Sequence, residues 1–316
     1  MMKIDKKVMW GSIAALISTI FIASYSTFTK ILLGHFSTYS LAAIAQIFSV
    51  ITMAFFFGAF PEFKKLKTLP YKVIWGLIAV GILSAVIQPL FLFTGLLKTS
   101  AINGALISRT QMVMVSLISA LWLRERVTPP QIAGTVVMLG GAYFIATHGL
   151  TESLAWGSGD LLLFAAAFFG ALSTAVFKRF ATEVSPQLVV LRRNTLGILL
   201  NLSIVPFIFQ FRHDFNPIFD VKVLAVLTVF SLTVIVGAQS LWYKAVEVIP
   251  ANRASNIGMT SPIFGVLFAM GILGEKLTSY HMIGGVLILI GLFFSTLHHQ
   301  ANPMHGDHLK ARNWSH

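Results

Sequence analysis

The chain has 316 residues, of which 56% are hydrophobic and only 11% are charged, so its polar side chains are too few to cover a soluble globule. The sequence contains no cysteine, which excludes a disulfide framework, a thiolate nucleophile and a cysteine-ligated metal or iron–sulfur site. A formal net charge of +12 would suit a nucleic-acid partner, but the basic residues form short clusters between apolar runs, which indicates membrane topology instead.

Ten apolar runs of roughly 18 to 25 residues follow one another, and each is long enough to cross about 30 Å of hydrocarbon as a helix. The runs are continuously apolar and do not alternate, which favours helices over a β-barrel. The first run follows three lysines and is too long for a signal-peptide core, so we interpret it as a retained span. The predicted spans are residues 8–28, 38–60, 73–96, 101–123, 129–147, 157–177, 187–209, 221–243, 252–273 and 280–297.

The distribution of Lys and Arg predicts that both termini lie in the cytoplasm. With that orientation, the basic residues outside the cell or inside the membrane are Lys30, Lys98, Arg109, Arg212, Lys222 and Lys276. The cytoplasmic side receives Lys3, Lys6, Lys7, Lys64, Lys65, Lys67, Lys72, Arg124, Arg126, Lys178, Arg179, Arg192, Arg193, Lys244, Arg253, Lys310 and Arg312. We therefore expect a multi-pass protein of the cell inner membrane with a short polar cytoplasmic tail, residues 298–316.

One segment occurs twice. Residues 99–143 and 249–293 align without a gap at a constant shift of 150 positions, and the matched pairs include Glu125/Glu275 and Gly141/Gly291. A duplicated unit is the simplest interpretation. Ten spans then divide into two units of five, and an odd number of crossings forces the second unit to enter the membrane from the opposite face. Such an inverted repeat is typical of carriers that work by alternating access.

The repeated motifs carry a family resemblance. The elements LWLRERVTPPQIAGTVVMLGG and MGILGEKLTSYHMIGGVLILIG each place a Glu at the end of one span, a Thr at the start of the next and a glycine-rich final helix. They resemble the EamA domain of the drug/metabolite transporter superfamily, with one copy at 8–147 and a second at 157–297. The segment from Phe177 and Lys178 to Arg193 is similar to the early part of such a repeat, but Ile44 stands where the second copy has Arg192.

The resemblance implies an all-α integral membrane protein with ten transmembrane helices, arranged as two inverted five-helix EamA repeats. It also implies a carrier of small metabolites in the cytoplasmic membrane, often an exporter, whose substrate differs between family members.

Arg109 is the clearest candidate for substrate contact. It lies about eight residues into the span predicted at 101–123, where a charge costs about 2.5 to 3.5 kcal/mol on insertion scales. A guanidinium can bind a carboxylate or another anion there bidentately. The alternative is a packing or gating Arg that hydrogen-bonds backbone carbonyls or extends toward the surface. The position shifted by 150 residues is Met259, so this site would be asymmetric.

Polar residues in the middle of other spans are further candidates. Gln88, next to Pro89, and Gln239 fall at nearly equivalent depths in the two halves, where two amides could orient a polar solute or hydrogen-bond between helices. Gln111 and Ser261 occupy matching positions. A kink at the proline after Ser261 could expose carbonyls to a cavity, or could be purely structural.

Tyr25 and Phe91 are the aromatic residues that we expect to form an apolar wall of the site. Other aromatic residues lie nearer to the span ends, where Trp and Tyr usually belong to the interfacial belt.

The carboxylates favour structural roles. Glu125 and Glu275 adjoin basic residues, and we expect each of them to form a local ion pair or to cap the following helix. We expect Asp160 to lie in the first turn of its helix, where the helix dipole stabilises a carboxylate. No carboxylate falls at mid-span, so the sequence does not support tight coupling to protons or sodium. It shows no intramembrane catalytic set, and we expect no enzyme activity, no cofactor and no metal.

The predicted function is secondary transport of a small metabolite, most simply an amino acid or a related compound that is exported. The alternatives are an importer or exchanger of another organic solute, such as a nucleotide-like cofactor or drug, and a membrane channel or scaffold without turnover. The expected partners are the small-molecule substrate and the lipid bilayer. Whether the protein forms a homodimer stays an open question at this point.

Overall fold

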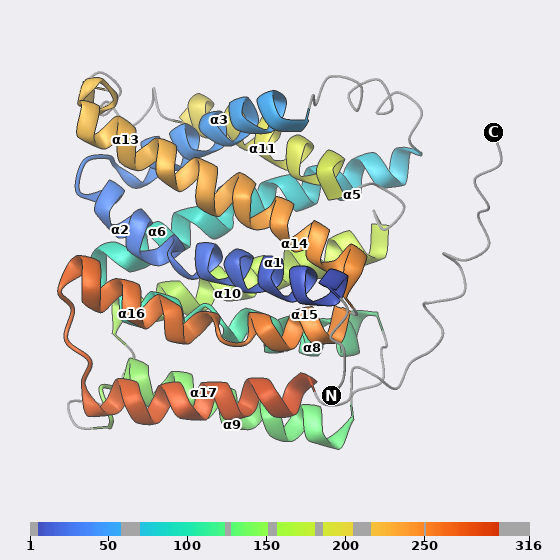
Figure 1. Cartoon of the computed structure of the whole chain (residues 1–316), viewed down its shortest axis with the longest axis vertical. Coiled ribbons are helices and arrows are strands. Elements are labelled where there is room, and N and C mark those ends of the chain that lie inside the picture. The colour runs from blue at the N-terminus through green and yellow to red at the C-terminus, as the bar shows by residue number, and fades with distance from the viewer. Residues whose placement is uncertain are drawn as a thin grey trace.

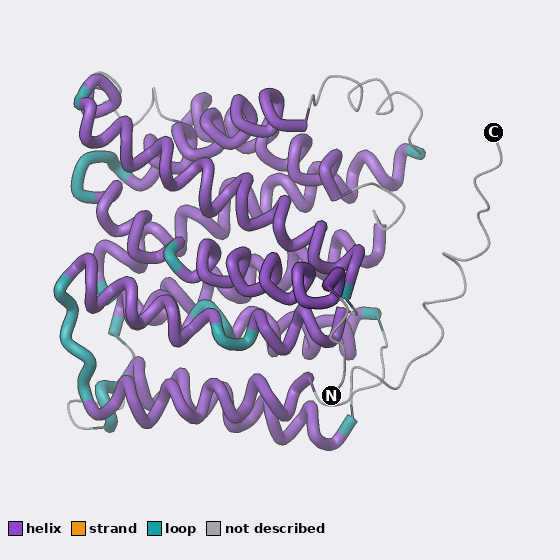
Figure 2. The backbone as a smooth tube through the Cα atoms, viewed as in Figure 1, coloured by secondary structure: helices purple, strands orange, loops and turns teal. Residues whose placement is uncertain are grey.

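The computed structural model describes residues 6–57, 70–123, 128–150, 157–180, 186–204, 216–249 and 251–296, without a small number of side chains inside these ranges. Short loops join helices throughout this part of the chain, which contains no strand (Figure 2). The predicted all-helical architecture is therefore confirmed for the described residues.

The first half of the chain, which holds the repeat predicted at 8–147, contains the following elements: α1 Lys6–Ala23, α2 Tyr25–Leu33, α3 Thr38–Phe57, α5 Tyr71–Gly81, the π-helical segment η2 Ile82–Ile87, α6 Gln88–Lys98, α7 Ala101–Ile107, α8 Thr110–Trp122 and α9 Pro129–Ala146. The second half, which holds the repeat predicted at 157–297, contains α10 Ser158–Phe180, α11 Pro186–Ile204, the 3-10 turn η4 Asn216–Phe219, α13 Val221–Phe230, the π-helical segment η5 Ser231–Gly237, α14 Ala238–Val248, α15 Ala251–Gly258, α16 Ser261–Leu273 and α17 Ser279–Thr296.

Five continuous stretches are long and apolar enough to cross a membrane: Lys7–Leu33, Tyr71–Lys98, Ala101–Trp122, Ser158–Phe180 and Val221–Trp242. Shorter apolar helices cover Thr38–Thr52, Ser261–Leu273 and Ser279–Phe294. Large apolar side chains on the outer surface, such as Phe55 and Leu121, are more than four-fifths exposed, as lipid contact requires. Described helices overlap every predicted span; the distal parts of three, 58–60, 205–209 and 297, lie outside the described residues.

The helices lie roughly side by side along one direction, with α9 and α17 forming one margin of the bundle (Figure 1). α1 begins and α17 ends at the same end of the bundle, whereas the connection between α16 and α17 lies at the opposite end (Figure 1). α10 packs on α5, α6 and α8 in the interior, and α1 packs on α14 and α16. α3 lies against α11, so elements from the two halves alternate through the bundle.

Two stretches contain a π-helical segment in mid-course, and for η2 a missing hydrogen-bond donor is the cause. Pro89 has no N–H, so it cannot donate to the carbonyl of Ala85 one turn earlier. The π-helical segment η2 ends at Ile87, two residues before this proline, and the freed Ala85 carbonyl accepts hydrogen bonds from the side-chain amides of Gln46 and Asn201. A prolyl break in one helix is thereby bonded to two neighbouring helices, α3 and α11.

α9 and α17 form an antiparallel pair in close contact, and glycine makes it possible. A Cβ added to Gly141 would lie 2.7 Å from the carbonyl oxygen of Gly284, and one added to Gly291 would lie 2.5 Å from that of Gly134. These are backbone neighbours, which cannot move aside as a flexible side chain could. Glycine at positions 141, 284 and 291 therefore permits the close packing of the two helices, whereas Gly140 has open space around it.

The pair Gly141 and Gly140 provides a test of this contact. Gly141→Ala should lower the stability of the detergent-solubilised protein by about 1 to 3 kcal/mol, the usual cost of overpacking. Gly140→Ala adds the same methyl group to the same helix without a clash, and it should leave the melting temperature unchanged or raise it slightly. Thermal unfolding of both variants measures the difference, and equal melting temperatures would contradict the packing described for α9 and α17.

Candidate functional site

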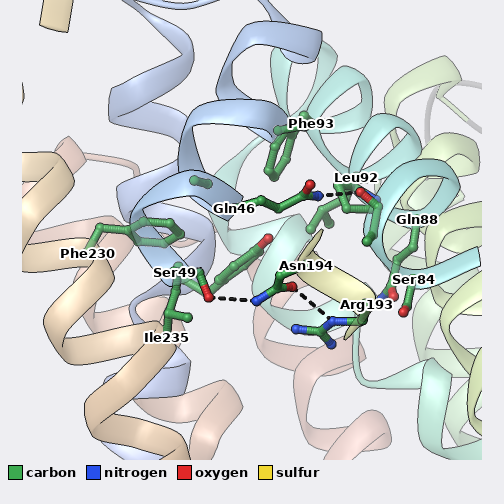
Figure 3. Close-up of a pocket in the computed structure, with 15 residues that line it drawn as sticks. Gln46, Ser49, Ser84, Gln88, Leu92, Phe93, Arg193, Asn194, Phe230 and Ile235 are labelled. Atoms are coloured by element: carbon green, nitrogen blue, oxygen red, sulfur yellow. Dashed lines mark hydrogen bonds between the residues drawn. The ribbon is translucent and has the colours of Figure 1, made fainter. Parts of the chain in front are cut away.

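Two adjoining cavities lie in the interior of the bundle. The first, of about 240 Å³, has the polar lining residues Tyr25, Gln46, Ser49, Ser84, Gln88, Arg193 and Asn194 (Figure 3). The second, of about 210 Å³, has the polar lining residues Tyr25, Ser26, Gln88, Ser108, Arg109 and Gln111. We name them the Arg193 chamber and the Arg109 chamber. They share Tyr25, Gln88 and Leu92, so one wall is common to both.

The Arg193 chamber is built where α11 faces α3. Asn194 is buried and donates from Nδ2 to Ser49 Oγ at 2.7 Å, which fixes α11 against α3 (Figure 3). Arg193 donates from Nε to Asn194 Oδ1 at 3.2 Å, which holds the guanidinium beside the chamber (Figure 3). Gln46 is bonded to the Ala85 carbonyl freed by the proline, so the same irregularity that interrupts one span organises this wall.

The Arg109 chamber is built at a break in the fourth predicted span. α7 ends at Ile107, and Arg109 is the residue before α8, so its side chain leaves a turn rather than a regular helix. Its Nη2 donates to Ser261 Oγ at 2.7 Å, whereas its Nε is buried without a hydrogen-bond partner. A buried polar atom without a partner costs about 1 to 3 kcal/mol. This group therefore has an unfilled capacity to bind an acceptor.

Two amides meet beside this chamber. Gln88 donates from Nε2 to Gln111 Oε1 at 3.2 Å, and both side chains line the chamber. Gly170 of α10 gives them room, because a Cβ at that position would lie 2.5 Å from Gln88 Nε2 and 2.8 Å from Gln111 Oε1. The amide pair thus depends on a missing side chain in a third helix.

Most of the predicted site residues come together. Arg109, Gln88, Gln111 and Tyr25 line the chambers, and Ser261 binds the Arg109 guanidinium. The side chain of Gln239 lies outside the described residues. Phe91 lines neither chamber; its ring stacks on Phe169 of α10 with centroids 5.2 Å apart. Substrate contact by any of these residues stays a prediction.

The sequence analysis missed the other half of the site. It counted Arg193 only among the basic residues of the cytoplasmic side, whereas the structure shows that this half-buried side chain lines a chamber, together with Asn194, Gln46, Ser49, Ser84 and Phe230. A signal was present, because the Arg193-Asn194 pair falls within the run predicted at 187–209. Counting basic residues by side cannot distinguish a span end from an internal cavity.

A second polar network lies where α2, α7 and the α16–α17 connection meet. Lys30 Nζ is 3.1 Å from Glu275 Oε1 and donates to the Thr99 carbonyl at 2.6 Å. Glu275 also accepts from the backbone N–H groups of Ala101 and Ile102 at 2.7 and 2.9 Å, which caps α7. The predicted local ion pair or cap of the following helix is wrong for Glu275, because its carboxylate binds the distant Lys30 and caps α7. Glu125 lies outside the described residues.

Asp160 continues this network into the interior. It is buried and accepts hydrogen bonds from Thr99 Oγ1 at 2.7 Å and Asn103 Nδ2 at 2.8 Å. Asn103 Oδ1 lies 2.9 Å from Nε2 of His281 in α17. Asp160 is in the first turn of α10, as predicted, and its side chain also joins α10 to α7. Among the described residues, no cluster of His, Asp or Glu could hold a metal ion.

Comparison with known proteins shows which family the sequence matches and which transporters it resembles. The model of the EamA-like transporter family matches residues 9–147 and again residues 157–297. An uncharacterized transporter of Methanothermobacter thermautotrophicus is 26% identical over 302 residues, covering 90% of this chain and 85% of that protein. An uncharacterized transporter of Synechocystis is 27% identical over 243 residues, covering 74% of this chain and 68% of that protein.

Two further similarities are more distant. A probable amino-acid metabolite efflux pump of Salmonella typhimurium is 23% identical over 200 residues, covering 61% of this chain and 66% of that protein. A solved crystal structure superposes with a TM-score of 0.58 at 15% identity, covering 91% of this chain and 96% of the other, which shows a shared fold.

The Glu275 network makes a stability prediction. Glu275→Gln removes the charge that pairs with Lys30 and weakens the cap on α7, so it should destabilise the protein by about 1 to 3 kcal/mol. The matched control is Lys276→Gln, which changes the adjacent charge but none of these contacts. Thermal unfolding in detergent compares the two, and a control as destabilised as Glu275→Gln would contradict the assignment of the ion pair to Lys30.

Proposed function

The chain belongs to the EamA-like transporter family, and on that premise we propose that it is a secondary transporter that exports a small carboxylate-bearing metabolite, such as an amino acid, across the cytoplasmic membrane. Because the family is one of transporters, the proposal contains no catalytic step. The proposed topology has ten spans with both termini in the cytoplasm, which agrees with the distribution of Lys and Arg.

The contacts between the two matched portions support a pair of inverted repeats. α9 and α17 are antiparallel, and their close contacts join Gly141 to Gly284 and Gly134 to Gly291. A shift of 150 positions turns Gly134 into Gly284 and Gly141 into Gly291, so it exchanges one contact for the other. This is the pattern of a two-fold axis perpendicular to both helices, which lies in the membrane plane if they span the bilayer.

Other contacts follow the same exchange. α10 packs on α6 and α8, and α1 packs on their counterparts α14 and α16. The π-helical segments η2 and η5 also occupy corresponding positions. Two halves of similar structure and opposite orientation can exchange conformations, which opens a central site first to one side and then to the other. We propose alternating access as the transport mechanism on this basis.

The observation that carries the proposed substrate is the half-buried Arg109 side chain, whose Nε atom is fully buried, beside the Arg109 chamber. Its Nε lacks a partner, its Nη2 binds a neutral hydroxyl, and no described carboxylate lines the chamber. A cation surrounded by neutral groups inside a protein favours an anionic ligand, and a guanidinium matches a carboxylate in geometry. The similarity to the Salmonella efflux pump agrees with an amino-acid metabolite and with export.

The test is substrate counterflow into proteoliposomes that contain the purified protein, with a panel of amino acids and other organic acids. We expect saturable exchange of a carboxylate solute. Arg109→Gln should raise its half-saturation concentration about ten- to a hundredfold, because hydrogen bonds to charged groups contribute about 1.5 to 3 kcal/mol.

Arg179→Gln is the control, because Arg179 is exposed and lies over the Trp122 ring outside both chambers. It should transport like the unmodified protein. A linear flux without saturation would contradict the carrier mechanism, and an Arg109→Gln variant with unchanged half-saturation would contradict the role of Arg109.

A further inference from the structure

The two chambers contain one arginine each, and the arginines come from different halves of the chain. Arg109 lies between α7 and α8 in the first half, and Arg193 lies on α11 in the second. Tyr25, Gln88 and Leu92 line both chambers. A ligand that bridged the two chambers at this common wall would lie between the two arginines.

Within the part of the chain that the structure describes, the lining of both chambers has positive charges and no acidic residue. The described carboxylates are used elsewhere: Asp160 binds Thr99 and Asn103, Glu275 binds Lys30 and caps α7, and Asp220 caps α13. None of the three lines either chamber. Two cations in a low-dielectric interior repel each other, and a ligand with two negative charges neutralises both.

The neutral groups of the Arg193 chamber suit a carboxylate more than an extended apolar group. Ser84 and Gln88 stand on one side, and Asn194 and Ser49 stand on the other, all within the same cavity (Figure 3). Leu92 of the common wall and Phe230, whose ring centroid is 5.5 Å from that of Tyr25, offer apolar surface for a short carbon chain. Each chamber, at about 240 and 210 Å³, is smaller than the range of about 300 to 1,000 Å³ that is usual for small-molecule sites, which favours a small ligand.

Resting on the proposed transport of a carboxylate, we infer that the substrate is a dicarboxylate, such as an acidic amino acid, with one carboxylate bound by Arg109 and the other by Arg193. Arg193 is then a residue that determines specificity. The alternative role is structural, because Asn194 beside it joins α11 to α3. A structural residue would affect all ligands alike, whereas a specificity residue affects only those with the second carboxylate.

The experiment compares ligands that differ by a single carboxylate. Glutamate is compared with glutamine and succinate with succinamate, because each amide has nearly the shape of its acid without the second charge. Inhibition of counterflow in proteoliposomes measures the affinity of each ligand. We expect the unmodified protein to bind each acid about tenfold or more tightly than its amide, as a charge-assisted bond of about 1.4 kcal/mol or more implies.

The variants assign this preference to particular residues. Arg193→Gln should reduce the preference to less than about twofold while the amides still bind, whereas Arg109→Gln should weaken acid and amide together. Arg193→Lys, which keeps the charge, should retain part of the preference. Arg192→Gln is the matched control, because it removes a charge from the adjacent position, which lines neither chamber. It should leave the preference unchanged.

Two outcomes would overturn the inference. In the first, the unmodified protein binds acids and amides equally well; this needs no variant and leaves saturable transport of another solute intact. In the second, Arg193→Gln weakens both members of each pair by the same factor, which identifies a structural residue. Neither outcome contradicts the carrier mechanism, whereas flux without saturation contradicts the carrier mechanism and leaves the ligand comparison without a basis.

Discussion

Every polar group inside a lipid bilayer needs a partner within the protein, and the structure depends on how this requirement is met. Pro89 frees the Ala85 carbonyl, and Gln46 and Asn201 bond to it from two other helices. The first N–H groups of α7 likewise receive the carboxylate of Glu275, which is 174 residues away from Ala101. Irregular backbone in the spans is therefore where distant helices are joined. The same irregular regions place Gln88 and Arg109 beside the chambers.

Symmetry and asymmetry have separate roles in this molecule. The residues that match between the two portions, above all the glycines of α9 and α17, form contacts that the shift of 150 positions exchanges. The charged residues at the chambers do not match, because Arg109 corresponds to Met259 and no arginine of the first portion corresponds to Arg193. A symmetric frame suits a mechanism in which two halves exchange conformations, whereas an asymmetric site suits a particular solute with two different ends.

The sequence predicted the fold better than the site, for a physical reason. Apolar length is a property of a continuous segment, so the helices could be located. The cost of a buried charge singled out Arg109, which lines a chamber. The direction in which a side chain points from its helix depends on how the helices pack against one another. Phe91 was placed at a suitable depth but faces Phe169, and the local partner expected for Glu275 gave way to Lys30, a residue 245 positions away. Arg193 was not identified as a candidate site residue because the rule for basic residues describes loops and cannot recognise a cavity between helices.

The central claim is that two inverted halves alternate, and distances between labelled pairs at the two ends of the bundle test it most directly. The chain has no cysteine, so single pairs can be introduced for spin labels without removing native thiols. Leu97 with Ile272 reports on the end where α6 and α16 finish, and Trp122 with Val248 reports on the end where α8 and α14 finish; all four side chains are exposed. Addition of a transported solute to the reconstituted protein should change the two distances in opposite directions. Two distances that stay fixed, or that change together, would contradict alternating access.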